Sequence, residues 1–304
     1  MEENIDVVKE ELKEVKRRLF NTTLKTAMIM VLFLVELFVI GKILIQSGIV
    51  PNPGKENKNN IAVLNINKEI TIGYVDTLMN KIDKELSKKT TKEFLVIINS
   101  PGGSPSASDE LSEYLKFVND KKKVTVYVEA MAASGAYYIA SAIKPLNANK
   151  NAIIGSIGVI MPHYNLGDLA KKLGVQEDYL AAGKYKKPIS YFKPLDKENK
   201  EYLKDNLLMP TYKNFIQSVA DNRGLSFKEV EKFADGRIYI ANDPKIKGIL
   251  VDNLTNLYKI KEKIKERYKD VSFTDITTEK KGLFPIESKI NLNLNTLTDS
   301  SILK

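Results

Sequence analysis

The feature that most constrains this chain is an apolar run near its N-terminus, TAMIMVLFLVELFVIGKILI, at residues 26–45. About twenty mostly apolar residues form a helix long enough to cross the hydrocarbon core of a bilayer. On an insertion scale Glu36 costs about 3 kcal/mol at mid-helix, whereas the thirteen Leu, Ile, Phe and Val residues return about 0.3–0.6 kcal/mol each. The balance favours insertion, so we predict one transmembrane helix, with the globular part of the chain built from later residues.

The alternative is a signal peptide that is removed. No small-x-small cleavage site follows the run, and the 25 residues before it are long and charged for a signal peptide, so we favour a retained anchor. Basic residues are concentrated on the N-terminal side, which predicts a cytoplasmic N-terminus and an extracytoplasmic domain. The basic residues before the run are Lys13, Lys16, Arg17, Arg18 and Lys25, and those that closely follow it or end it are Lys42 and Lys55.

Residues 1–25 carry a second, shorter pattern. Apolar residues recur at spacings of 3 and 4, as in a heptad repeat, over about two heptads. The segment is therefore either a short coiled coil that favours self-association or an amphipathic helix on the membrane surface. The apolar positions are Ile5, Val8, Leu12, Val15 and Leu19.

Composition excludes several kinds of site. The chain has no cysteine, which excludes disulfides, thiolate metal sites and a cysteine nucleophile. Its one histidine, His163, excludes a zinc site built on several histidines. The net charge of +9 comes from lysines interleaved with Glu and Asp along the chain, without a nucleic-acid motif, so we expect no nucleic-acid partner.

Residues 46–60 are polar and contain Pro and Gly, as in a linker. The following residues alternate between strands and helices, which predicts an α/β domain with a mainly parallel sheet over residues 61–269. After Asp270 the chain becomes polar, and we expect a C-terminal tail over 270–304 in which residues 282–292 could dock. The expected strands are 61–66, 94–98, 124–128, a glycine-broken 151–160, 175–180 and one within 235–252; the expected helices are 72–88, one that follows the loop 99–105 and includes 107–118, 165–173, 196–222, 225–234, a short one within 235–252 and 255–268.

Ser134 lies in VEAMAASGAYYIASA, directly after the strand 124–128, among Ala, Gly and Met. A serine at a strand-to-helix turn can be presented to a substrate, but its hydroxyl needs a neighbouring base to become a good nucleophile. Small residues in such a turn are equally typical of a helix packed closely on a sheet. Taken alone, this motif favours packing over catalysis.

A second loop, Asn99-Ser100-Pro101-Gly102-Gly103, follows a buried strand. Glycines allow backbone conformations that expose N–H groups, and such groups can stabilise an oxyanion together with the N–H of Ser134. The simpler interpretation is an ordinary turn between a strand and a helix.

Two kinds of base are available downstream. His163 lies near the end of the glycine-broken strand, and three lysines, Lys184, Lys186 and Lys187, lie in the basic loop 181–188. A lysine base must be neutral, which near pH 7 requires a pKa shift worth about 4–5 kcal/mol, of a size that burial can supply. The residues themselves do not choose among the three lysines.

Five motifs in order resemble the signal peptide peptidase A family of membrane-anchored serine proteases, over roughly residues 61–255. They are SPGG before Gly103, AASGAYYIASA around Ser134, GSIGVI at 155–160, GKYK at 183–186 and ADGRIYI…GILVD at 234–252. The resemblance implies a ClpP/crotonase-like fold, a Ser–Lys dyad without metal or other cofactor, and a ring-like or dome-like homo-oligomer whose dyads can be shared between protomers.

The resemblance implies Ser134 as nucleophile, Lys186 as general base, Ser156 as the serine that orients the lysine, and Gly103 as the oxyanion-hole glycine. One departure is Gly135-Ala136, where the family usually has Gly-Gly. A Ser134–His163 pair stays open, because ClpP itself uses a histidine downstream of its serine.

The sequence thus predicts a membrane-bound endopeptidase that forms an acyl-enzyme with signal peptides or other short apolar peptides. Two alternatives remain. One is a catalytically silent membrane scaffold of the same fold that binds peptides. The other is a crotonase-type acyl-CoA enzyme, which the apolar run at 26–45 and the basic loop disfavour.

Overall fold

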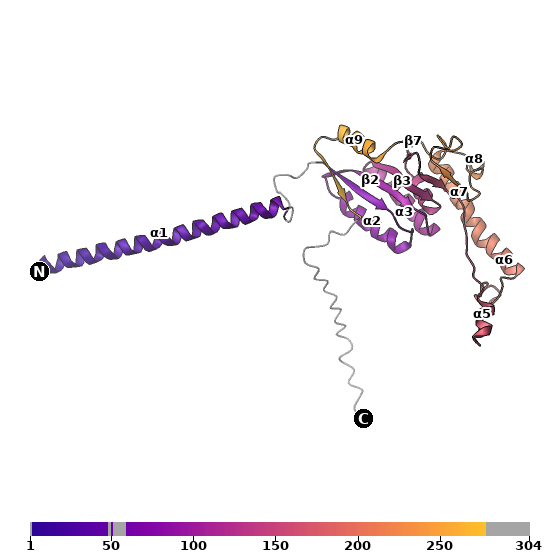
Figure 1. Cartoon of the computed structure of the whole chain (residues 1–304), viewed down its shortest axis with the longest axis horizontal. Coiled ribbons are helices and arrows are strands. Elements are labelled where there is room, and N and C mark those ends of the chain that lie inside the picture. Colours follow the sequence, from indigo (N-terminus) through magenta and orange to yellow (C-terminus); the bar gives the residue numbers. More distant parts are fainter. Residues whose placement is uncertain (1, 48–49, 51–58, 278–304) are drawn as a thin grey trace, which may run out of the picture. The chain divides into compact units, whose positions relative to one another are not determined.

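The computed structural model describes residues 2–47, 50 and 59–277 (Figure 1). The chain divides into two compact units, residues 1–57 and 58–304. The first unit contains α1 (Glu2–Gln46), a single helix of 45 residues. The segment expected at 1–25 and the apolar run at 26–45 are therefore parts of one helix. By length and composition, its stretch Leu12–Gln46 is long and apolar enough to cross a membrane.

The second unit is built on one mixed sheet, with strand order β6-β5-β3-β2-β1-β8 and with β4 and β7 attached beside β3. The pairs are parallel, apart from the antiparallel β5 and β6. The predicted α/β fold with a mainly parallel sheet is confirmed. The strands are β1 (Asn59–Ile66), β2 (Thr91–Ser100), β3 (Val124–Ala133), β4 (Asn147–Ala148), β5 (Ile153–Gly155), β6 (Ile238–Ile240), β7 (Asn253–Leu254) and β8 (Val271–Asp275).

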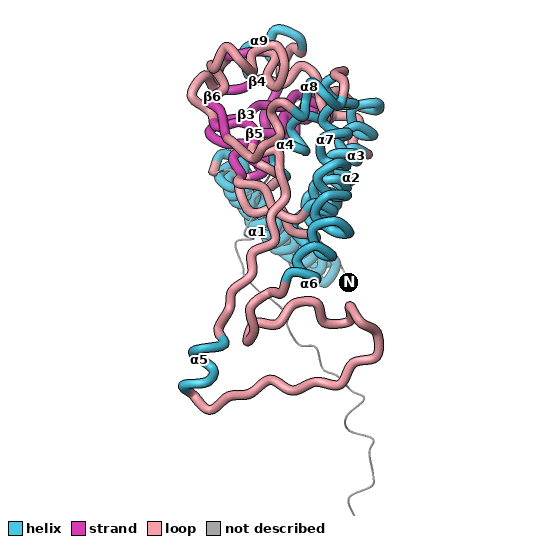
Figure 2. The backbone as a smooth tube through the Cα atoms, turned by 90° about the vertical axis from the view of Figure 1, so that its right-hand side faces the viewer, coloured by secondary structure: helices cyan, strands magenta, loops and turns pink. Residues whose placement is uncertain are grey.

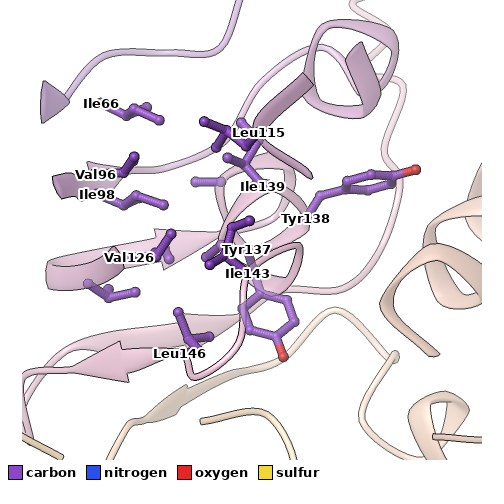
Figure 3. Packing of buried hydrophobic residues seen from close by; sticks show 14 of the residues in the cluster. Ile66, Val96, Ile98, Leu115, Val126, Tyr137, Tyr138, Ile139, Ile143 and Leu146 are labelled. Carbon is purple, nitrogen blue, oxygen red and sulfur yellow. The ribbon is translucent and has the colours of Figure 1, made fainter. Parts of the chain in front are cut away.

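Helices cover both faces of this sheet because its central strands are apolar on both sides. On one face, side chains of β1, β2 and β3 such as Ile66, Val96 and Val126 pack against Leu115 and Ile139 from the helices (Figure 3). The opposite face carries a smaller cluster that includes Ile260 and Ile264 of α9. The helices are α2 (Ile72–Leu86), α3 (Pro105–Lys121), α4 (Gly135–Ser141), α5 (Gly167–Lys172), α6 (Lys197–Leu203), the π-helix η1 (Lys204–Leu208), α7 (Met209–Arg223), α8 (Phe227–Glu231) and α9 (Leu257–Arg267).

Two strands differ from the sequence prediction where they meet. β3 continues beyond residue 128 to Ala133, because its last residues pair with β5 after an irregularity in the ladder. The strand expected at 151–160 is only Ile153–Gly155, because Gly155 and Ser156 take positive φ values of 106° and 52° and turn the chain out of the sheet. Both changes bring the two strand ends together.

Two further expectations are wrong. Residues 175–180 form no strand. They lie in the arm, residues 160–196, which joins β5 to α6 and extends away from the sheet (Figure 2). The long helix expected at 196–222 is confirmed over 197–223, where α6, η1 and α7 follow one another without a break. The π-helical turn η1 lies just before Pro210, which has no N–H to continue the α-helical pattern. The short helix expected within 235–252 is instead a series of turns.

The ordered domain also continues beyond the expected boundary at residue 269. β8 pairs in parallel with β1 along Asn59–Val63, and a polar sequence can form such an edge strand because its outer side faces solvent. The candidate docking segment 282–292 lies outside the described residues.

An ion pair ties the end of α7 to the turn before β7. Both guanidinium nitrogens Nη1 and Nη2 of Arg223 donate to Asp252, at 2.8 and 2.7 Å, and its Nε donates to the carbonyl of Ile249. The Arg223 side chain is 1% exposed and that of Asp252 is 25% exposed. Tyr137 of α4 donates to the carbonyl of Leu250 in the same turn, so the network supports the helix that follows Ser134.

We expect Arg223→Ala to lower the free energy of unfolding by about 3 kcal/mol, because Asp252 keeps its partly buried charge without a partner. Burial raises the pKa of Asp252, but hydrogen bonds from Arg223 and from the N–H of Leu146 outweigh it and lower the pKa below its usual value. The stabilisation is therefore present above the ordinary carboxyl pKa of about 3.9 and is lost as the pH falls through the lower folded value.

Urea unfolding of wild type and variant across this pH range measures the effect. The control is Arg237→Ala, which removes an exposed ion pair with Asp235 and should cost less than about 1 kcal/mol. Equal losses in the two variants, or a loss at Arg223 that does not shrink in acid, would contradict the assignment.

Candidate active site

Ser134 is the first residue after β3 and the N-cap of α4, with φ 53° and ψ −126°. Residues other than glycine rarely adopt this conformation, and where it occurs it is held by its surroundings. Here the N–H of Ser134 donates to the carbonyl of Gly155 at 2.9 Å, and its own carbonyl accepts from Tyr137 and Tyr138 at 2.9 and 3.0 Å. The turn thereby presents the Ser134 hydroxyl at the end of the strand.

Ser156 lies beside Ser134 because of the register between β3 and β5. Ala133 pairs with Gly155, so the two serines follow paired residues at the ends of neighbouring parallel strands. Ser156 has a similar positive φ of 52°, and its N–H donates to the carbonyl of Arg237 at 2.8 Å. Two serines expected from sequence to act together are thus brought together.

The Pro-Gly-Gly loop after β2 packs directly against this turn. At Gly102, φ is 103°, and a Cβ atom there would lie 2.7 Å from the carbonyl oxygen of Ala133. A Cβ at Gly103 would overlap the backbone of Ile70. Ser100, buried at 1% exposure, donates to the carbonyl of Lys68 at 2.6 Å and accepts from the N–H of Gly102. Gly102 therefore allows the loop to approach Ser134 closely, and Gly103 allows it to approach Ile70.

These contacts correct the expected oxyanion hole. The N–H of Ser134 is already bonded to Gly155, so it cannot also serve a substrate carbonyl. Within the part of the chain that the structure describes, no hydrogen-bond acceptor is found for the N–H of Gly103 or Gly135. The Gly103 nitrogen lies 3.3 Å from the position that a Gly135 Cβ would take, so these two N–H groups are neighbours and form the better pair of donors.

Two cavities meet at Ser134, which lines both of them together with Gly103, Pro105, Gly158 and Val159. The first, about 590 Å³, has polar walls from α3, α4 and α7, where the Tyr138 hydroxyl lies 2.5 Å from both Asp109 and Ser218. The second, about 880 Å³, includes Ser156 and more apolar side chains. Those apolar side chains are Val159, Ile160, Leu208, Met209 and Tyr212.

The three lysines of the basic loop differ in whether a carboxylate forms an ion pair with them. Lys184 forms an ion pair with Glu198, and that hydrogen bond raises the pKa of Lys184. Lys187 lies 2.6 Å from Glu177. Among the described residues, no carboxylate lies within 4.0 Å of the ammonium group of Lys186, and its side chain is exposed. Of the three lysines, Lys186 is the one that no described residue holds in an ion pair.

The structure does not bring either predicted base to Ser134 within one chain. Lys186 and His163 both lie in the arm, and neither lines the cavities beside the serine. His163 contacts the carbonyl of Ser190 through Nε2 at 2.9 Å and stacks on Tyr191, which is consistent with a structural role. The lysine that does line the second cavity is Lys204 of η1, which the sequence analysis did not identify.

Sequence reasoning also missed Asp109, Tyr138 and Ser218, which form the polar wall of the first cavity. Three different helices supply them, so no local motif could connect them. Within residues 2–47, 50 and 59–277, no group of three or more His, Asp or Glu side chains is arranged to hold a metal ion.

Comparison with known proteins gives consistent matches. Residues 116–272, just over half of the chain, match Peptidase family S49, and residues 59–154 match Clp protease. A protein of Methanocaldococcus jannaschii named as a putative protease is 39% identical over 69% of this chain and 67% of its own length.

Two other similar proteins also carry peptidase names. A protein of Synechocystis, also named as a putative protease, is 34% identical over 65% of this chain and 70% of its own length. A protein of Enterococcus faecium named as a putative signal peptide peptidase SppA is 34% identical over 59% of this chain and 51% of its own length.

The backbone at Gly102 lies too close to Ala133 and Ser134 to leave room for a side chain. We expect Gly102→Ala to lower kcat/KM for peptide hydrolysis by about 100-fold, because the added methyl group displaces the loop that carries one oxyanion donor. Gly73→Ala in α2, where a Cβ would meet nothing within 4 Å, is the matched control and should leave hydrolysis unchanged. Equal activity of the two variants would contradict the role of the loop.

Proposed function

Because the chain belongs to peptidase family S49 and is therefore a serine peptidase, we propose that it is a membrane-anchored endopeptidase with Ser134 as its nucleophile. The observation that carries this proposal is the conformation of Ser134, held at the end of β3 between the two cavities and beside the N–H groups of Gly103 and Gly135. A serine that only packed a helix onto the sheet would not need this strained backbone.

In the proposed reaction, the Ser134 Oγ attacks the carbonyl carbon of the scissile peptide bond while a base takes the hydroxyl proton. The negative oxygen is stabilised by the N–H groups of Gly103 and Gly135. The C–N bond then breaks, and the proton passes to the leaving amine. Water hydrolyses the remaining ester and releases the second product and the free serine.

We propose Lys186 as the base, oriented by Ser156, as the family resemblance implies. Two observations support a lysine supplied by a neighbouring protomer. Lys186 has no ion-pair partner in the described chain, and the arm that carries it does not line the cavities at Ser134. Insertion into a partner's cavity would also bury Lys186, which favours the neutral form that a base needs. The active protein would then be a homo-oligomer.

The substrates we propose are signal peptides or other short apolar peptides. The second cavity supports this choice, because Val159, Ile160, Leu208 and Met209 offer an apolar wall within reach of Ser134. We also propose a position for the protein in the membrane, supported by the length and apolar composition of α1 and by the basic residues before its apolar run. α1 anchors the protein, with its N-terminus in the cytoplasm and the peptidase domain outside.

We expect Ser134→Ala to abolish both peptide hydrolysis and labelling by a fluorophosphonate, because both require the same activated hydroxyl. A Ser134→Ala protein that hydrolyses peptides at the wild-type rate would exclude the proposal. Failure of the wild-type protein to react with the probe would instead favour a silent peptide-binding scaffold.

The base is tested by three variants measured together, Lys186→Ala, His163→Ala and Lys204→Ala. We expect the first to lower kcat by at least about 100-fold and the other two to retain activity, since general-base catalysis contributes about 10²–10⁴-fold. A loss confined to Lys204→Ala would identify a base within the same chain and exclude Lys186.

Sharing of the site between protomers is tested by mixing two inactive proteins. If the dyad forms across an interface, Ser134→Ala and Lys186→Ala chains unfolded and reassembled together should regain up to about one quarter of wild-type activity, because one protomer supplies the serine and its neighbour the lysine. If both residues act within one chain, every mixed site lacks one of them and no activity returns. The two variants reassembled separately are the controls.

A further inference from the structure

The edge of the sheet opposite Ser134 carries a cluster of lysines. β1, β2 and β3 run in parallel, so their first residues meet at one edge and Ser134 follows the other. We call the cluster at the first edge the lysine-rich edge. Its members come from the turn between α2 and β2, the start of β2, and the connection from α3 to β3: Lys89, Lys92, Lys121, Lys122 and Lys123.

The two turns that carry these lysines are in contact. The ammonium group of Lys122 donates to the carbonyl of Lys88 at 2.6 Å, and the N–H of Phe94 donates to the carbonyl of Lys123 at 2.9 Å. Partial burial lowers the pKa of Lys122, and the nearby charge of Lys92 lowers it further. The five lysines therefore form one surface on which like charges crowd together.

This positive charge is poorly compensated. In the described part of the chain, no carboxylate lies within 4.0 Å of the ammonium groups of the lysine-rich edge. The carboxylate of Glu85 lies close by but is engaged, at 2.6 Å from Lys88 and 2.8 Å from the Thr91 hydroxyl. Asp120, an exposed neighbour, offsets one of the five charges. A net positive surface remains, and such a surface attracts anions.

An exposed aromatic side chain accompanies the lysines. Phe117 of α3 is 45% exposed, and the ammonium group of Lys121 lies 3.8 Å from the centre of its ring. Lysines beside an aromatic residue are typical of surfaces that lie at the interface between a membrane and water. A binding surface for single-stranded nucleic acid would offer several stacking aromatics, whereas Phe117 is the one large aromatic side chain exposed on this part of α3.

The lysine-rich edge is also the edge at which the chain enters the domain. β1 enters the domain here, because Asn60 pairs with Thr91 and the Asn59 side chain donates to the carbonyl of Lys269 at 2.6 Å. Twelve residues separate Gln46, the end of α1, from Asn59. Twelve residues span at most about 40 Å even when fully extended. The tether to a membrane-spanning α1 therefore starts next to the lysines.

We propose that the lysine-rich edge binds the anionic headgroups of membrane phospholipids. This inference rests on the anchoring by α1 proposed above. Lysines close to an anionic membrane surface add their contributions, and salt screens the attraction over a Debye length of about 10 Å at 0.1 M. The tether supplies a high local concentration of the membrane, so a surface of moderate affinity suffices to hold the domain in one orientation.

The test exploits the absence of cysteine from the chain. Full-length protein is reconstituted into vesicles of phosphatidylcholine, with or without phosphatidylglycerol, that also contain a lipid with a quenching nitroxide on its headgroup. A single fluorophore is attached at Thr90→Cys, on the lysine-rich edge, or at Asn206→Cys in η1. We expect strong quenching at position 90 in anionic vesicles, loss of that quenching at about 1 M salt, where the Debye length is about 3 Å, and little quenching at position 206.

Charge reversal supplies the matched control. Lys89→Glu, Lys92→Glu, Lys121→Glu and Lys123→Glu combined should abolish the quenching at position 90. The same number of reversals elsewhere, at Lys200, Lys213, Lys228 and Lys232, changes the net charge equally and should preserve it. Peptide hydrolysis in detergent should be unchanged in the first variant, because none of its residues lines the cavities at Ser134.

Several outcomes would overturn the proposal: quenching that does not depend on lipid charge, equal quenching at positions 90 and 206, equal effects of the two sets of reversals, or a fluorescence response to RNA without one to anionic vesicles. Failure of α1 to anchor is recognised separately, because the protein would then not float with neutral vesicles.

Discussion

The site depends on the last residue pair between β3 and β5. That pair, Ala133 with Gly155, directs the N–H of Ser134 to the carbonyl of Gly155 and so holds the serine in its unusual conformation. The same pair places Ser156 next to it. Because the N–H of Ser134 is used in this way, the donors left for an oxyanion are those of Gly103 and Gly135, and the Pro-Gly-Gly loop can approach only without side chains. One backbone contact therefore positions the proposed nucleophile, the neighbouring Ser156 and the proposed oxyanion donors.

The part of the proposed site that lies on the arm is exposed rather than packed into the domain. The proposed nucleophile and oxyanion donors lie at the end of a sheet that is packed on both faces, whereas Lys186, the proposed base, lies on the arm. The arm has exposed apolar side chains, among them Ile160, Leu173 and Leu180 at 88%, 69% and 103% exposure. Exposed apolar surface of this kind is typical of an interface between proteins. This division agrees with a dyad shared between protomers, in which assembly would bring the exposed arm of one chain to the rigid sheet of another. Single chains would then be inactive before assembly.

The sequence was a good guide wherever local pattern decides the structure. Buried apolar runs predicted β1 and β2, periodicity predicted α2 and α3, and the glycine loop was placed correctly. It failed where tertiary contacts decide. Residues 175–180 have the composition of a strand but lie beside no edge of the sheet. The polar β8 becomes a strand only because it pairs with the free edge of β1. No local signal indicates that the N–H of Ser134 is used by Gly155, or that Lys204 and Asp109 line the cavities. The family resemblance added Lys186 and Ser156, which spacing alone could not have chosen.

The length of β2 sets how far the chemistry lies from the attachment point of the domain. Its ten residues, at about 3.3 Å each, separate the edge where Asn59 enters from the edge where Ser134 is presented by about 30 Å. With the lysine-rich edge on the lipid surface, a peptide still embedded in the bilayer would need about nine extended residues to reach the serine. The length of the sheet would then exclude intact membrane proteins with short external loops as substrates, while fragments released from the bilayer could still reach Ser134.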